Sequence, residues 1–343
     1  MGSGGEGTRG RRIRRGVACP AAPATFITAV IMRILVTGSS GWLGAALVPL
    51  LRAAGHAVFG LDSRPGATTK LLGSVADRGF VRAAIGDNRI DAVVHGGGLH
   101  KPNIETHARA DFLSVNVQGT FNLLEEAVAL GVQRFVFTST TSLMVSREIR
   151  AATAPEAVWL TEEFNACPRN IYGVTKLSGE HLCRLYHEQF GLPVAVLRTA
   201  RFFPETDDMA RDIAQSGPNT KANELLFRRL TRADAAAAHV VALEKAPGIG
   251  FDVFIVSAMP PFAREDCAQL MTDAPAVVAR YFPDYPALYA KHGWTMFDRI
   301  DRIYDPSRAL RRLGFRCRTG FREMLDELAA GQVPDYLATR VWP

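Results

Sequence analysis

The sequence predicts an α/β fold, a doubly wound parallel sheet followed by a smaller C-terminal lobe. From Arg33 onward, short β-branched runs alternate with segments of helical period. The runs are continuously apolar, which is typical of strands that a parallel sheet buries on both faces. A glycine-rich turn at residues 38–44 follows the first run directly. Together these three observations favour strands joined by helices that cover both faces of one sheet.

The expected elements follow one another along the chain. We expect strands at residues 33–37, 57–61, 92–95, 134–138, 193–197 and 251–256. Helices are expected near residues 42–54, 108–130, 172–190 and 234–245. Pro49 removes an internal hydrogen bond from the first helix, so we expect that helix to bend.

The alternation of strands and helices stops after Ala200. Residues 204–220 are polar and carry several acids, which predicts a loop or lid. Proline and aromatic residues then become frequent, and we expect the aromatic side chains to form the core of a small lobe. They are Tyr281, Phe282, Tyr285, Tyr289, Trp294 and Phe297. The expected organisation is a sheet domain at residues 32–200 and 226–257, and a substrate lobe at residues 201–225 and 258–343.

Composition excludes disordered and fibrous classes, because 48% of the 343 residues are hydrophobic and 22% are charged. The net charge of +6 is concentrated in residues 1–31, where five arginines face one acid, leaving only +2 for the rest. We expect these residues to form a disordered extension, with targeting, membrane anchoring and nucleic-acid attraction as alternatives. Pro20 and Pro23 interrupt the apolar run that imitates a secretory leader.

The remaining chain gives no sign of a membrane or nucleic-acid partner. No other segment is apolar and long enough to cross a bilayer. The five cysteines are scattered without a Cys-x-x-Cys pair, so we expect neither a metal site nor a disulfide framework. A reducing, cytoplasmic location is the one that fits this pattern.

The turn after the first strand has the spacing Gly-x-x-Gly-x-x-Gly and opens a helix, which is the context of a dinucleotide site. Gly38 permits a tight turn, Gly41 lets the backbone approach a pyrophosphate, and Gly44 permits close packing of helix on strand. A single glycine-rich turn is weak evidence by itself. We expect cofactor contacts from Gly38, Ser40, Gly41, Trp42, Leu43 and Gly44.

An acid at the end of the second strand strengthens this interpretation. Asp62 lies 18 residues after Gly44, where its carboxylate can accept hydrogen bonds from both ribose hydroxyls of NAD. The same charge repels a 2′-phosphate, so NAD is favoured over NADP. Ser63 follows in the same contact region, and the nearby Arg64 keeps NADP as an alternative because it could pair with a phosphate.

Tyr172 and Lys176 are spaced to lie on one face of a helix. A neighbouring cation favours the phenolate form of a tyrosine, which could then exchange a proton with a substrate hydroxyl. Thr140 follows the fourth long strand at the edge where parallel sheets bind ligands. Asn116 lies inside a long helix, where asparagine is unfavourable unless it has a specific role.

As a set, these motifs resemble the extended short-chain dehydrogenase/reductase family, particularly NAD-dependent epimerase/dehydratase proteins, over residues 32 to about 329. The resemblance implies a Rossmann fold, Tyr172 as acid and base, Lys176 on the nicotinamide ribose, Thr140 on the substrate, and Asn116 as a structural or relay residue. Residues 93–98, including Gly96, correspond to a segment against the cofactor. The chain departs from the family at Ser74, where an acid usually contacts adenine.

The residues after Thr140 bear on the reaction. Dehydratases and decarboxylases of the family carry acids here, whereas this chain has Thr141 and Ser142, so elimination and decarboxylation are disfavoured. The pattern resembles 4-epimerases, which act through a keto intermediate. Arg201 stands where nucleotide-sugar epimerases usually have asparagine, and residues 203–205 resemble hexuronate dehydrogenases. We therefore expect epimerisation of a sugar or sugar nucleotide, with net dehydrogenation and a non-catalytic dinucleotide sensor as alternatives.

Three further residues are candidates for the substrate. Ser142 follows the strand end, and the guanidinium groups of Arg201 and Arg211 could each bind a carboxylate or phosphate. Arg228 or Arg229 could also face an anionic ligand, and we expect His239 to be a packed or exposed helix residue rather than a catalyst. The helical stretches at residues 108–130 and 172–190 resemble the family's dimer helices, which implies a homodimer.

Overall fold

The computed structural model describes residues 1–2, 31–205 and 215–340. The chain divides into two compact units, Met1–Val30 and Ile31–Pro343, and every element described below lies in the second. The extension expected at residues 1–31 thus lies almost entirely outside the described residues.

Seven parallel strands form the main sheet, in the order β3-β2-β1-β4-β5-β7-β8. The sequence predicts a parallel sheet with six of these strands and does not predict the two-residue β3. They are β1 (Arg33–Thr37), β2 (Ala57–Asp62), β3 (Leu71–Leu72), β4 (Ala92–His95), β5 (Arg134–Thr140), β7 (Val194–Thr199) and β8 (Phe251–Val256). The order reverses between β1 and β4, and ligands of doubly wound sheets bind at such a reversal, beyond the carboxyl ends of the strands.

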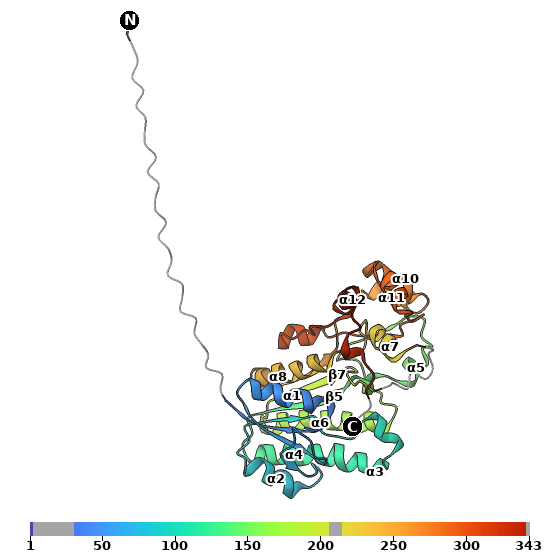
Figure 1. Cartoon of the computed structure of the whole chain (residues 1–343). Helices are drawn as coiled ribbons and strands as arrows, with labels where there is room; N and C mark the ends of the chain where they lie inside the picture. The colour runs from blue at the N-terminus through green and yellow to red at the C-terminus, as the bar shows by residue number, and fades with distance from the viewer. Residues whose placement is uncertain (3–30, 206–214, 341–343) are drawn as a thin grey trace. The chain divides into compact units, whose positions relative to one another are not determined.

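Helices cover both faces of this sheet (Figure 1). On one face α1 (Trp42–Ala53) packs against α8 (Arg232–Ile249), and on the other lie α2 (Arg78–Gly86), α4 (Gly119–Ala129) and α6 (Ile171–Phe190). Successive strand residues enter opposite cores: Ile34 and Val36 pack under α1 and α8, and Leu35 packs under the other helices. This explains why the strands contain continuous apolar runs, and it confirms the predicted fold class.

The helix expected at residues 108–130 is not uniform. It consists of α3 (Arg109–Phe112), a π-helical stretch Leu113–Gln118 and α4. Asn116 is the buried residue of the π-helical stretch. Inserted π turns of this kind are frequent at functional sites.

A third core lies outside the sheet and contains most of the aromatic residues expected there, including Phe282, Tyr285, Tyr289 and Phe297. Tyr281 differs, since it is 39% exposed. The surrounding elements are α7 (Gly217–Glu224), α9 (Cys267–Leu270), α10 (Ala274–Tyr281), α11 (Tyr285–His292), α12 (Phe321–Ala329) and a parallel pair of β6 (Val158–Leu160) and β9 (Arg302–Tyr304). The described unit is compact throughout, so its division into two domains stays a prediction.

The polar segment expected as a loop is partly helical, because α7 begins at Gly217. The helix is capped by Ser216, whose side chain accepts a hydrogen bond from Asn219 N at 3.3 Å. It is hydrophilic yet buried, so its apolar periodicity is too weak to reveal a helix. The short α5 (Arg147–Ala151) lies on the segment that follows β5. Among the described residues, no helix combines the length and apolarity that a bilayer span requires.

Candidate active site

The glycine-rich turn lies against the end of β4. Gly38 has a φ of +72°, and a Cβ atom there would lie 2.7 Å from the backbone N of Gly97. A Cβ at Gly44 would lie 2.4 Å from the carbonyl oxygen of Gly38. Side chains are therefore excluded from both positions, and α1 reaches its strand as closely as a dinucleotide turn requires.

The first turn of α1 keeps its backbone donors. Gly41 is the N-cap, and no side chain caps the helix. Its neighbours Leu43 and Gly44 are buried, whereas Ser40 and Trp42 are half-buried. Backbone N–H groups at a helix start attract phosphate groups, so this end of α1 fits a pyrophosphate.

Asp62 lies beside this turn, at the end of β2. Its Oδ2 accepts a hydrogen bond from Ser40 N at 2.9 Å, and its Oδ1 accepts one from Arg64 N at 3.0 Å. Each oxygen retains a second lone pair, as recognition of a ribose diol requires. Ser63 is exposed next to it. The glycine turn, the helix end without a side-chain cap and this carboxylate together fit a dinucleotide cofactor.

A chain of hydrogen bonds links the cofactor turn to Asn116 through His95. Gly97 N donates to Thr37 Oγ1 (3.0 Å), which bonds His95 Nδ1 (2.7 Å). His95 Nε2 bonds Thr120 Oγ1 (3.0 Å), which donates to the carbonyl oxygen of Asn116 (2.6 Å). Burial lowers the pKa of His95 well below its usual value, so the ring is neutral. No motif of the sequence indicated a role for His95, although the sequence places it at the end of an expected strand.

The Asn116 side chain joins two segments that are far apart in the chain. Its Oδ1 accepts from Leu99 N at 2.8 Å, and its Nδ2 donates to Leu99 O at 2.9 Å and to Thr175 Oγ1 at 3.0 Å. Thr175 precedes Lys176 on α6. The segment after Gly96 is thereby fixed against the helix that carries Tyr172.

Tyr172, Lys176 and Thr140 come together where β5 ends, all three of them buried. The Thr140 hydroxyl lies close enough to the Tyr172 phenol to lower the pKa of Tyr172. Lys176 Nζ donates to the carbonyl oxygen of Thr138 at 2.8 Å and lies 4.8 Å from the centre of the Phe137 ring. The structure thus brings together the residues that the spacing placed on one helix face and at one strand end.

Burial dominates the electrostatics of this group. It raises the pKa of Tyr172 to about 12, against a smaller opposing effect of the hydrogen bond from Thr140. It lowers the pKa of Lys176 to about 8. Both shifts favour the neutral forms, so additional positive charge at the site is needed to ionise the phenol near neutral pH.

The candidate substrate residues are distributed differently. Ser142 is half-buried, and its backbone N donates to Thr140 Oγ1 at 3.1 Å, so it lies next to the reaction centre. Arg201 is half-buried and donates from Nη2 to the carbonyl oxygen of Glu205 at 3.1 Å. Arg211 lies outside the described residues.

Arg228 and Arg229 correct an expectation. Both are buried and both bind the buried Glu224, from Arg228 Nη2 to Oε1 at 2.7 Å and from Arg229 Nε to Oε2 at 2.6 Å. The buried carboxylate of Glu224 thus binds the two guanidinium groups that we considered as partners of an anionic ligand. Glu224 belongs to α7, which the sequence did not predict, so this pairing was hidden.

The segment after β7 lies near the glycine turn. Trp42 Nε1 donates to Glu205 Oε1 at 2.7 Å, and Phe203 stacks on His100 with ring centres 5.1 Å apart. Burial, with Lys176, Arg64 and Arg201 nearby, lowers the pKa of His100 to about 4. His100 and Phe203 thus join the candidate site. Phe203 belongs to the fragment at residues 203–205 that resembles hexuronate dehydrogenases, whereas no motif indicated His100.

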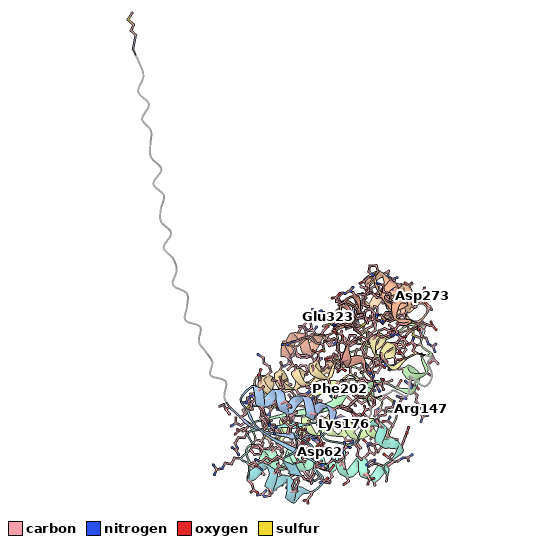
Figure 2. The ribbon with its side chains drawn as sticks, in the orientation of Figure 1. Asp62, Arg147, Lys176, Phe202, Asp273 and Glu323 are labelled. Carbon is pink, nitrogen blue, oxygen red and sulfur yellow. The ribbon has the colours of Figure 1, made fainter. Side chains whose placement is uncertain are left out.

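His239 is a packed residue, as expected. Its Nε2 bonds Thr138 Oγ1 at 2.8 Å and its Nδ1 bonds Ala235 O at 2.7 Å, so both nitrogens are occupied. Figure 2 shows Asp62 and Lys176 in the part of the molecule that carries the sheet, and Asp273 and Glu323 in the part that carries α10 and α12.

Comparisons with known proteins agree with this geometry. Residues 34–249, more than half of the chain, match the NAD dependent epimerase/dehydratase family. The chain is 29% identical over 273 residues to a 3 beta-hydroxysteroid dehydrogenase/Delta 5-->4-isomerase of Mycobacterium tuberculosis, covering 71% of each chain. It is 32% identical over 184 residues to UDP-glucose 4-epimerase 4 of Oryza sativa subsp. japonica, covering 48% of each.

Solved structures show the same fold. A short-chain dehydrogenase/reductase superfamily protein from Agrobacterium tumefaciens with bound NAD superposes with a TM-score of 0.59 at 26% identity, over 87% of this chain and 96% of that one. A mutated uronate dehydrogenase superposes with a TM-score of 0.60 at 21% identity, over 91% and 88%, which shows the fold alone. The family match and the dinucleotide site make this chain an enzyme of the NAD-dependent epimerase/dehydratase family.

Proposed function

We propose that this enzyme oxidises and reduces a secondary hydroxyl of a sugar or sugar nucleotide with NAD, and that the net reaction is epimerisation through a keto intermediate. The observation that carries the proposal is that Tyr172, Thr140 and Lys176 lie buried together at the end of β5, where Lys176 Nζ donates to the carbonyl oxygen of Thr138. A phenol, a hydroxyl and an ammonium at the carboxyl edge of a parallel sheet are suited to proton exchange with a bound alcohol.

In this proposal each residue has a separate task. Tyr172 takes the proton of the substrate hydroxyl and later returns it, and Thr140 orients the reacting oxygen by its hydrogen bond. Lys176 lowers the cost of the phenolate by its charge. Asn116 holds Leu99 against α6 and so keeps the wall of the site in place. Bound NAD supplies the acceptor, and on the return the donor, of a hydride.

The proposed cofactor is NAD rather than NADP. Asp62 is held beside the glycine turn by two backbone donors, and its charge would repel a 2′-phosphate at the same place. The proposed contacts are the positions of the glycine turn between Gly38 and Gly44, together with Asp62 and Ser63. The Agrobacterium tumefaciens structure with bound NAD supports this choice.

The residues after Thr140 support a reaction without elimination. Thr141 is buried, and its hydroxyl donates to Thr199 O at 3.4 Å, so it is engaged with the backbone. Ser142 is half-buried and carries no charge. Neither side chain is a carboxylate that could remove a second proton from the sugar.

Net dehydrogenation is the second candidate, because the Mycobacterium tuberculosis relative that aligns over 71% of the chain is named a dehydrogenase. The two reactions share their first half and differ in whether the hydride returns. Incubation with NAD and either UDP-glucose, UDP-N-acetylglucosamine, galacturonate or a 3β-hydroxysteroid separates them. Epimerisation gives an isomer by chromatography without accumulated NADH, whereas steady release of NADH would overturn it in favour of a dehydrogenase.

We also propose a homodimer and a cytoplasmic location. Leu113, beside α3, and Val174 and Leu185 on α6 are 51%, 43% and 42% exposed, and apolar side chains at these positions could pack against a second copy. The free thiols of Cys167, Cys183, Cys267 and Cys317 suit a reducing compartment. Light scattering after gel filtration tests the dimer, and L113E/V174E should give a monomer if these helices form the interface.

A further inference from the structure

A buried ion pair lies next to the candidate reaction centre. Glu180 follows Lys176 by one helical turn on α6, and Arg198 belongs to β7. Their exposed fractions are 5% and 6%. Arg198 Nη2 donates to Glu180 Oε2 at 2.8 Å, and Arg198 Nε lies 3.0 Å from Oε1 and 3.2 Å from Oε2. The two residues therefore join α6, which carries Tyr172 and Lys176, to β7.

Glu180 also holds the end of β5. Ser139 Oγ donates to Glu180 Oε1 at 2.5 Å, and Ser139 is the residue before Thr140. Lys176 binds the carbonyl oxygen of Thr138, one residue earlier. Two successive turns of α6 thus fix two successive residues of β5, and the next residue is Thr140, whose hydroxyl lies beside the phenol of Tyr172.

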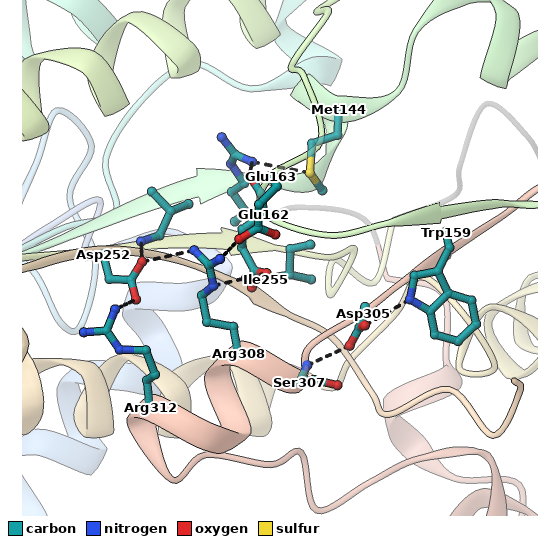
Figure 3. A network of polar contacts seen from close by, with 12 residues as sticks. Met144, Trp159, Glu162, Glu163, Asp252, Ile255, Asp305, Ser307, Arg308 and Arg312 are labelled. Atoms are coloured by element: carbon teal, nitrogen blue, oxygen red, sulfur yellow. Dashed lines mark hydrogen bonds and ion pairs between the residues drawn. The ribbon is translucent and has the colours of Figure 1, made fainter. Parts of the chain in front are cut away.

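Arg198 extends this network to the segment that follows Thr140. Its Nη1 donates to the carbonyl oxygen of Glu162 at 3.2 Å and lies 3.5 Å from the sulfur of Met144. Figure 3 shows the continuation around Glu162, whose carboxylate accepts from Ile255 N at 2.8 Å and faces Arg308. Through Glu180, the Arg198 guanidinium group is connected to Ser139, which precedes Thr140. It also contacts Met144 and Glu162, which follow Thr140.

Stability alone is a poor explanation for such a pair. Removing two charges from water costs about as much as their attraction returns, and apolar residues of similar volume are often equally stable. A fixed pair instead sets the relative position of the elements that it joins. The Glu180 carboxylate also offsets positive charge, because two cations, Lys176 and Arg198, lie near it.

The charged and titratable groups around Lys176 are few. Those that influence it, or that it influences, are Glu180 and Cys183 on α6, His95 on β4, His100 after β4 and His239 on α8. Burial lowers the pKa of each of the three histidines and raises the pKa of Cys183, so these groups are neutral near pH 7. Glu180 is the carboxylate of this set.

We infer that Glu180 and Arg198 are positioning residues of the reaction centre: they set Ser139 and Thr140 against Tyr172, and Glu180 supports the charge of Lys176. The inference rests on the proposed function for its kinetic part only. The geometry and the charge balance belong to the protein itself and can be tested without a sugar.

The first test uses the whole protein without substrate. Lysine labelled with ¹³C at Cε is followed by NMR against pH, and the Lys176 signal is assigned with K176R. Glu180→Gln should lower the Lys176 midpoint by about one pH unit or more, because an attractive charge is lost and Arg198 becomes unpaired. Glu180→Asp keeps the charge and should restore most of the midpoint.

Glu126→Gln is the matched control. Glu126 is also buried on a helix and pairs with two arginines, Arg78 Nε at 2.7 Å and Arg82 Nη1 at 2.7 Å, but these lie on α2, away from Lys176. It should lower stability and leave the Lys176 midpoint unchanged. If Glu180→Gln also leaves the midpoint unchanged, the charge role of Glu180 is wrong.

The second test is kinetic and uses NAD with whichever of the four compounds above the wild type converts. Glu180→Gln should lower kcat about tenfold or more, the loss expected when a charged hydrogen bond no longer orders the reacting groups, while KM stays within about twofold. Ser139→Ala removes one hydroxyl, should fold normally, and should lower kcat by a smaller factor with the same KM. Equal kcat values in Ser139→Ala, Glu126→Gln and wild type would overturn the positioning role.

The outcomes separate this inference from the proposed function. If no compound is converted, the proposed function fails, and a lowered Lys176 midpoint in Glu180→Gln still supports the charge role. If Glu180→Gln does not fold, Ser139→Ala decides: a kcat equal to that of wild type contradicts the inference, and a lowered kcat with unchanged KM supports it.

Discussion

The ammonium of Lys176 lies 2.8 Å from the carbonyl oxygen of Thr138, so the catalytic helix is fastened to β5 two residues before Thr140. This single contact brings a residue of α6 to the strand edge where the substrate is expected. It also buries the ammonium, and burial lowers the pKa of Lys176 to about 8. The predictions below follow from this arrangement and from the cofactor turn.

Replacing the phenol should abolish turnover but not cofactor binding. Tyr172→Phe keeps the ring and removes the proton donor, so kcat should fall about 10²- to 10⁴-fold, the usual contribution of a general acid or base. The dissociation constant of NAD, measured by calorimetry, should change little. Unchanged kcat would show that another group handles the proton, and His100 is then the next residue to test.

The activity should fall on the alkaline side of pH 8. Lys176 loses its proton as the pH rises through its pKa of about 8, and its charge no longer stabilises a Tyr172 phenolate. A plot of log(kcat/KM) against pH should bend downward there. A profile that stays flat up to pH 10 would contradict the role proposed for this ammonium.

The same shift has a definite sign for stability. Between about pH 8 and 10.5, unfolded Lys176 is protonated and folded Lys176 is not, so the unfolded state binds more protons. The cost of burying Lys176 is therefore fully present below pH 8 and decreases as the pH rises toward 10.5. The free energy of unfolding, measured in urea for wild type and Lys176→Met, should increase for wild type relative to the variant between about pH 8 and 10.5.

Asp62 should determine cofactor affinity. Asp62→Ala removes the acceptor for the ribose hydroxyls, and the dissociation constant of NAD should rise about ten- to a hundredfold, which corresponds to about 1.5–3 kcal/mol. The preference for NAD over NADP should shrink in the same variant. Asp77→Asn is a suitable control, because Asp77 caps α2 and asparagine caps helices equally well. Equal NAD affinity in wild type and Asp62→Ala would place the ribose elsewhere.

Gly38→Ala should be more damaging than Gly131→Ala. The two glycines have nearly equal φ values, +72° and +73°, but a Cβ meets Gly97 N at 2.7 Å only at Gly38, while Gly131 has nothing within 4 Å. In both variants the left-handed backbone should lower the free energy of unfolding by about 1 kcal/mol or more, and the steric clash should lower it further in Gly38→Ala. Thermal unfolding with and without NAD measures the stability of each variant and its stabilisation by the cofactor. Equal losses would mean that the turn can open away from β4.

The sequence predicted much of the sheet because its signals are local. Each of β1, β4 and β8 has the predicted bounds, since a continuously apolar run is visible without knowledge of its neighbours. The spacing of Tyr172 and Lys176 on one helix is likewise a local property. The roles of these residues, and of the proposed cofactor and substrate contacts, remain predictions.

Other features depend on contacts between distant segments, and only the tertiary structure decided them. The π-helical stretch around Asn116 forms where its side chain meets Leu99 and Thr175, and α7 is a polar helix that burial stabilises. From the sequence, Arg228 or Arg229 was a candidate for binding an anionic ligand, whereas in the structure both pair with Glu224 of α7.

By itself, then, the sequence determined the strands, the glycine turn, the acid after β2 and the spacing of the phenol and ammonium, because each is encoded within one or two turns of chain. Only the tertiary structure decided which polar groups are paired, because a charge or hydroxyl finds its partner from another element after the sheet has formed. The pairing of Glu180 with Arg198 and Ser139 is the example nearest the proposed chemistry, and it joins residues up to 41 positions apart.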